Sequence, residues 1–116
     1  MAGAVKQCTQ LTGLAVSKHP HRVLTSYYNK IMRALENIPK DSAYRIHTSK
    51  LVAQRLAIVS TEPDVSKMEE KINAGQAEEL ILQAEKELML VRKMITWKPW
   101  QQLETEAPPN QWKWPL

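Results

Sequence analysis

The stretch from Gly75 to Leu116 constrains the fold most, because a long helical pattern runs directly into a tail rich in tryptophan and proline. Neither glycine nor proline occurs from Gln76 to Thr96, and apolar side chains recur there at steps of one, three or four residues. This spacing places them along one stripe of an α-helix. The stripe comprises Ala77, Leu80, Ile81, Ala84, Leu88, Val91 and Ile95. The acids Glu78, Glu79, Glu85 and Glu87 are expected on the solvated face of this long helix.

The tail that follows holds three of the four tryptophans and four prolines within residues 98–116. Proline fixes φ and removes a backbone donor, so this segment is expected to run extended. Indoles are costly to leave in water, so they either pack back on the helices or dock on another protein. We expect a division, with two indoles near the helix end and two on a partner. The predicted partner interface comprises Trp97, Trp100, Trp112, Trp114 and Pro115.

Two further helices are predicted earlier in the chain. The first begins near Pro20, carries an apolar stripe and is stopped by Pro39. Its stripe comprises Leu24, Tyr27, Tyr28, Ile31, Leu35 and Ile38, and one of the two adjacent tyrosines is expected in the core. The second helix begins after Asp41-Ser42 and ends before Pro63. Its expected apolar side, less regular than the first, comprises Tyr44, His47, Leu51, Val52, Leu56 and Val59.

A short helical segment is predicted to turn the corner into the long helix. Asp64 can cap it, and Val65, Met68 and Ile72 are expected to point inward. Gly75 is the expected left-handed residue after its end. Met68, Met89 and Met94 are expected to fill gaps in the core.

These elements predict an all-α protein: a three-helix up-down-up bundle with a short extra helix before the long third helix and an extended C-terminal tail. The expected division is an irregular arm over residues 1–17, a helical bundle over 18–97 and an anchor tail over 98–116. A chain of 116 residues is of single-domain size, and its 3 glycines argue against a turn-rich β fold.

Charge is distributed unevenly along the chain. Residues 1–60 carry nine lysines and arginines against two acids, whereas residues 61–116 carry seven against ten. Such asymmetry is typical of a surface that faces a partner. A basic nucleic-acid-binding module is an alternative, although no cluster of five or six bases appears.

The sequence offers little that could carry catalysis. Cys8 is the only cysteine, so neither an intramolecular disulfide nor a cysteine-based zinc cluster can form. His19, His21 and His47 lack further ligands at metal-binding spacing, and no glycine-rich phosphate loop is present. No apolar run approaches the roughly 20 residues that span a bilayer. We therefore predict a protein that is not an enzyme and holds neither metal nor cofactor.

Several stretches together resemble a known family. They are Gln76 to Glu85 followed by Glu87-Leu88, Ile38-Pro39-Lys40, Ala43-Tyr44-Arg45, the turn Glu62 to Val65 and the ending Asn110 to Pro115. Across residues 11–116 the chain is similar to the 13-kDa accessory subunits of mitochondrial respiratory complex I (the NADH dehydrogenase [ubiquinone] 1 alpha subcomplex subunit 5 family).

The resemblance implies a non-catalytic subunit of the matrix-facing peripheral arm of NADH:ubiquinone oxidoreductase, near its quinone-reducing module. It implies a place on the matrix side of the mitochondrial inner membrane, other complex I subunits as partners, and no flavin, iron–sulfur cluster or quinone ligand. An alternative is a small mitochondrial adaptor of the Leu-Tyr-Arg type that binds acyl carrier protein. Ala43-Tyr44-Arg45 touches that motif, but it has alanine in place of leucine and opens the second helix instead of the first.

Overall fold

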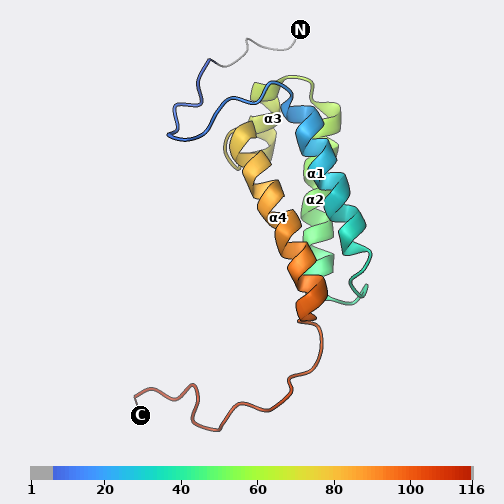
Figure 1. Ribbon diagram of the computed structural model, residues 1–116, viewed down its shortest axis with the longest axis vertical. Helices are drawn as coiled ribbons and strands as arrows, with labels where there is room; N and C mark the ends of the chain where they lie inside the picture. The colour runs from blue at the N-terminus through green and yellow to red at the C-terminus, as the bar shows by residue number, and fades with distance from the viewer. Residues whose placement is uncertain (1–6, 116) are drawn as a thin grey trace.

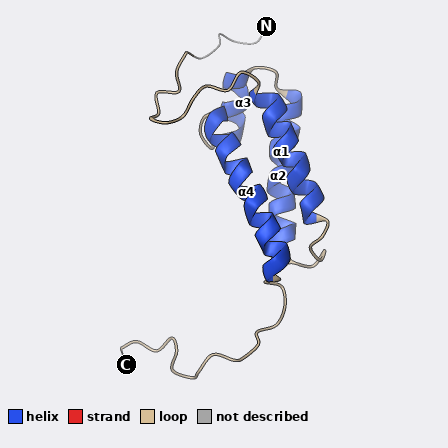
Figure 2. Cartoon of the chain, in the orientation of Figure 1, coloured by secondary structure: helices blue, strands red, loops and turns tan. Residues whose placement is uncertain are grey.

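Residues 7–115 are described by the computed structural model, and their regular structure is entirely helical (Figures 1 and 2). The helices are α1 (Pro20–Leu35), α2 (Ala43–Thr61), α3 (Val65–Ile72) and α4 (Ala77–Trp97). The prediction of an all-α protein is confirmed for this part of the chain. Residues 1–6 of the expected arm and Leu116 of the expected tail lie outside the described residues.

The three longer helices lie side by side, and α1 packs against both α2 and α4 (Figure 1). In that view α1 and α4 run in the same direction and α2 runs in the opposite direction. Helix α3 lies at the end of the bundle where α2 ends and α4 begins. This arrangement makes α1 the central element of the core. The described chain beyond α4 leads away from the helices as an extended segment that contains no helix and no β-strand (Figure 2).

The core lies mainly where α1 meets α4. Leu24 and Ile31 on α1 and Leu80 and Val91 on α4 are completely inaccessible, as the helical spacing predicts. Burying one such side chain contributes about 1.5–3 kcal/mol, so this contact stabilises the fold strongly. Tyr28 is the tyrosine that enters the core, and Tyr27 is only partly buried against it.

Helix α1 is shorter than predicted, since it ends at Leu35 rather than reaching Ile38. The amides of Glu36, Asn37 and Ile38 bond to carbonyls three residues earlier. This tighter turn replaces the last helical turn because the residue before a proline is excluded from the α region. Ile38 nevertheless stays in the core, with 1% of its surface exposed.

The inward face of α2 differs from the predicted one. Leu51 is 48% exposed and His47 is exposed, whereas Thr48 is buried with Val52 and Val59. Apolar residues occur on all sides of this helix, so their spacing does not define a single face. The expectation that Leu51 and His47 face inward is therefore wrong.

Helix α3 has the predicted cap, because the Ser66 amide donates to the Asp64 carboxylate at 3.1 Å. Met68, a residue of α3, is completely buried. The left-handed residue that ends α3 is Asn73, with φ 54°, and not Gly75. Asparagine tolerates this conformation better than other residues with a side chain. Gly75 follows with φ 109°, where a Cβ atom would meet the Glu79 carboxylate.

Two side chains of α4 lie where the sequence did not place them. Glu78 is 4% exposed instead of solvated, and its carboxylate accepts a hydrogen bond from the Ser17 amide at 3.2 Å. Met89 is 59% exposed and fills no gap in the core. The N-terminal segment therefore packs on the start of α4, where Gln76 Nε2 also donates to the Thr9 carbonyl at 2.7 Å.

Candidate functional site

The tail exposes the largest apolar side chains on the molecule. Trp112 and Trp114 are 86% and 87% exposed, and Pro115 beside them is exposed as well. The described tail contains turns but neither helix nor strand, and Figure 1 shows it running away from the helices. Indoles with this exposure are typical of protein interfaces, because each supplies a large apolar area with one polar atom.

The other two tryptophans stand at the end of α4. Trp97 is the last residue of the helix and is 63% exposed, while Trp100 packs against the edge of the core. Between them Lys98 takes the left-handed conformation, with φ 53°, and redirects the chain. The four indoles are thus not gathered into one cluster on this chain. Trp97, Trp112 and Trp114 remain available as interface residues.

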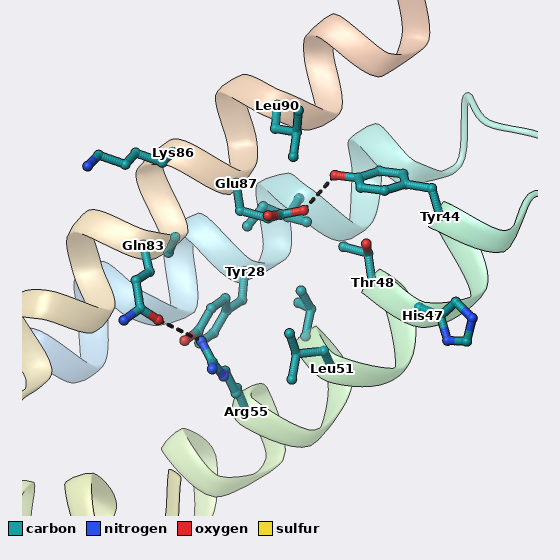
Figure 3. A pocket seen from close by; sticks show the side chains of 13 residues that line it. Tyr28, Tyr44, His47, Thr48, Leu51, Arg55, Gln83, Lys86, Glu87 and Leu90 are labelled. Atoms are coloured by element: carbon teal, nitrogen blue, oxygen red, sulfur yellow. Dashed lines mark hydrogen bonds between the residues drawn. The ribbon is translucent and has the colours of Figure 1, made fainter. Parts of the chain in front are cut away.

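A second surface, not predicted from the sequence, is an open groove between α2 and α4 (Figure 3). Its volume is about 550 Å³. Helix α1 forms the floor, and the facing sides of α2 and α4 form the walls. The residues that define it are Tyr28 and Ile31 on the floor, Tyr44, Leu51 and Arg55 on one wall, and Gln83, Glu87 and Leu90 on the other. We call this surface the α2–α4 groove.

Two hydrogen bonds cross the α2–α4 groove. The Tyr44 hydroxyl donates to the Glu87 carboxylate at 2.5 Å, and the Arg55 guanidinium donates to Gln83 Oε1 at 3.2 Å (Figure 3). Burial raises the pKa of Tyr44, and the bond to Glu87 with its negative charge raises that pKa further. These contacts link the two walls at the Tyr44–Glu87 and Arg55–Gln83 positions.

Tyr28 reaches the groove from below. It is 2% exposed, and its hydroxyl oxygen makes no hydrogen bond with any described residue. Burial raises the pKa of this phenol, and Arg55 offsets part of the effect through its positive charge and its closeness to the hydroxyl. Buried hydroxyls normally have a partner, because an unsatisfied one costs about 1–3 kcal/mol. The Tyr28 hydroxyl is thus enclosed in the floor of the groove beside Arg55.

The remaining candidates for chemistry are scattered. His21 contacts the Glu62 carbonyl at 2.7 Å, His47 lies on the rim of the α2–α4 groove, and Cys8 is exposed. Among residues 7–115, no three His, Cys, Asp or Glu side chains stand close enough together to hold a metal ion. None of the described helices combines the length and the apolarity needed to cross a membrane.

Comparison with known proteins identifies the family to which this sequence is similar. Residues 13–79 match the family model described as "ETC complex I subunit conserved region". The matched range covers α1, α2, α3 and the first residues of α4.

Individual relatives extend the similarity to the whole chain. NADH dehydrogenase [ubiquinone] 1 alpha subcomplex subunit 5 of Rattus norvegicus is 53% identical over 116 residues, which is 100% of both chains. The probable subunit of that name in Caenorhabditis elegans is 52% identical over 96% of this chain and 74% of its own. The probable mitochondrial subunit of Arabidopsis thaliana is 38% identical over 83% of this chain and 57% of its own.

Proposed function

This chain belongs to the family of the ETC complex I subunit conserved region, and from that premise we propose that it is a non-catalytic accessory subunit of mitochondrial NADH:ubiquinone oxidoreductase. In this proposal it stabilises the matrix-facing peripheral arm near the quinone-reducing module. It lies peripherally on the matrix side of the inner membrane. Its partners are other complex I subunits, mainly those of the peripheral arm, and it forms no independent homo-oligomer.

The observation that carries the proposal is the 53% identity along the full length of a relative that is named as a complex I subunit. The exposed tail supports a role in assembly, since Trp112 and Trp114 have little contact with their own chain. Such side chains gain most when a partner buries them. Attachment through the tail is therefore part of the proposal.

We propose that the chain works as three parts. Residues 1–17 are an irregular arm, residues 18–97 form an up-down-up bundle, and residues 98–116 are an anchor tail. Trp97 at the end of the bundle and Trp100 at the start of the tail mark the boundary between the two. The bundle supplies a rigid body and the tail supplies the contact. No flavin, iron–sulfur cluster, metal or quinone is bound by the chain itself.

An adaptor for acyl carrier protein has less support. Its motif would rest on Tyr44 and Arg45, but both side chains bond within the chain. Tyr44 donates to Glu87, and Arg45 donates to the Ile38 carbonyl at 2.5 Å. The Tyr44 hydroxyl and one N–H group of Arg45 are therefore already engaged within the chain.

Native electrophoresis of mitochondrial extracts, with an antibody against this chain, tests the proposal. We expect the chain to migrate with the intact NADH dehydrogenase activity band. The purified chain alone should oxidise no NADH and contain no stoichiometric flavin or metal. Migration as a free protein, or release from nucleic acid by moderate salt, would contradict the proposal.

A further inference from the structure

The α2–α4 groove is an unfilled apolar surface built into the folded helices, and it is separate from the tail. Helix α1 packs against both neighbouring helices, while α2 and α4 face one another across open space (Figure 3). Ile31 and Val52 lie at its base, and Leu51 on its rim is 48% exposed. A protein stabilised mainly by apolar burial gains nothing from leaving such a surface in water.

The charges around the groove indicate the chemistry of its occupant. Arg55 on α2 and Lys86 on α4 are the two lysine or arginine side chains among the residues that line it. Glu87 is the one acid that lines the groove, and it already accepts a hydrogen bond from Tyr44. A partner that enters here therefore meets a positive rim.

Arg55 is the specific anchor on that rim. Its guanidinium has five N–H donors, and its bond to Gln83 Oε1, at 3.2 Å, goes to an uncharged amide oxygen. Among residues 7–115 no carboxylate pairs with Arg55. The Tyr28 hydroxyl is enclosed beside Arg55 and is not accessible to a partner. A carboxylate presented to Arg55 would accept from the N–H donors that Gln83 leaves free, because a bond between guanidinium and carboxylate is stronger than one to an uncharged amide.

We propose that the α2–α4 groove receives an amphipathic helix of a neighbouring subunit, which inserts apolar side chains beside Leu51 and presents an aspartate or glutamate to Arg55. A helix is about 10 Å wide, so its backbone lies across the rims while its side chains fill the groove. This inference rests on the proposed function for the nature of the neighbour. It makes the chain a bridge that contacts one neighbour through its tail and another through its helices.

The chain's own tail is the weaker occupant. In the structure the tail runs away from α4, and its two outer indoles are 86% and 87% exposed (Figure 1). The lysine between them, Lys113, would add a positive charge to a rim that is already basic. A helix from another subunit that carries acidic residues fits the groove better, because its charge complements the rim and the tail points away from the groove.

Cross-linking within the intact, purified complex identifies the occupant directly. A photoreactive phenylalanine analogue replaces Leu51 inside the groove, and Lys50 on the other side of the same helix serves as the matched control position. We expect the Leu51 position to cross-link to a helical, acid-containing segment of a neighbouring complex I subunit, and the Lys50 position to leave that segment unlabelled. Cross-links from Leu51 to the tail of this chain, to lipid or to a segment without acids would overturn the inference.

Charge reversal gives an independent readout. Arg55→Glu should lower incorporation of the chain into the complex at least about tenfold, which corresponds to about 1.4 kcal/mol. Lys50→Glu should leave incorporation unchanged, and both purified variants should melt within about 2 °C of the unmodified protein. Replacing the cross-linked partner acid with lysine should restore incorporation of Arg55→Glu. Normal incorporation of Arg55→Glu would refute the inference alone, whereas absence of the unmodified chain from the complex would refute the proposed function.

Discussion

The Tyr44 hydroxyl on α2 donates a hydrogen bond to the Glu87 carboxylate on α4, and the two oxygens are 2.5 Å apart. This bond links the two helices that border the α2–α4 groove without direct packing between their backbones. Its strength depends on a protonated phenol and an ionised carboxylate. The stability contributed by this link therefore depends on the ionisation of Tyr44.

This relationship predicts a loss of stability at alkaline pH. The folded structure raises the pKa of Tyr44 above its usual value of 10.0, so folding favours the protonated phenol. The stabilisation is fully present below pH 10 and is lost as the pH rises further. At pH 8, Tyr44→Phe should lower the free energy of unfolding by about 1 kcal/mol. Urea denaturation between pH 8 and 11 should show this difference shrinking, and a difference that grows would contradict the assignment.

The contact between α4 and α1 predicts a large effect of Leu88→Ala. Leu88 is 5% exposed within the core, so the truncation should cost about 2–5 kcal/mol in the free energy of unfolding. Met89→Ala is the matched control on the next residue, which is 59% exposed. It should cost less than about 0.5 kcal/mol. Equal losses for the two variants in chemical denaturation would show that this stripe is not the core.

The Glu78 carboxylate is predicted to hold the N-terminal segment on α4. Glu78→Ala removes the acceptor of the Ser17 amide, which should reduce local stability by about 1–3 kcal/mol. Hydrogen exchange measured by NMR should then show faster exchange at Ser17, with little change in the middle of α1. Glu79→Ala provides the control, because Glu79 is the adjacent acid and is only partly buried. Unchanged protection of Ser17 in Glu78→Ala would contradict the role of this carboxylate.

The sequence predicted the elements whose signals are local. The spacing of apolar residues in α4 and the cap at Asp64 each depend on neighbours within a few positions, and both are present in the structure. Glu78 was misplaced because its partner Ser17 lies 61 positions away. No local pattern distinguishes an acid that accepts such a bond from one in water.

The candidate site, too, depends in part on contacts between residues that are far apart in the sequence. The tryptophans of the tail are visible as residues in the sequence, but the α2–α4 groove exists only because α1 holds two helices apart. Leu51 was expected inward because it is apolar, yet it lies on the rim of that groove. Apolar residues on all sides of α2 hide which face meets the core. Only the packing of the helices resolves this ambiguity.

The tail carries the central claim, since Trp112 and Trp114 have little contact with their own chain. Ordering an extended segment costs about 1–2 kcal/mol per residue in backbone entropy, so the tail becomes fixed only where a partner buries its indoles. Trp112→Ala combined with Trp114→Ala should reproduce most of the effect of deleting residues 111–116. Trp100→Ala is the contrasting variant, because Trp100 packs on the core and should lower the melting temperature instead.

The most direct measurement pairs thermal melting of the protein lacking residues 111–116 with native electrophoresis of complex I from cells that carry the same truncation. We predict that the melting temperature changes by less than about 2 °C, while incorporation into the complex fails or falls at least about tenfold. Unfolding of the truncated protein would show that the tail belongs to its own core. Normal incorporation would show that the tail is not the anchor.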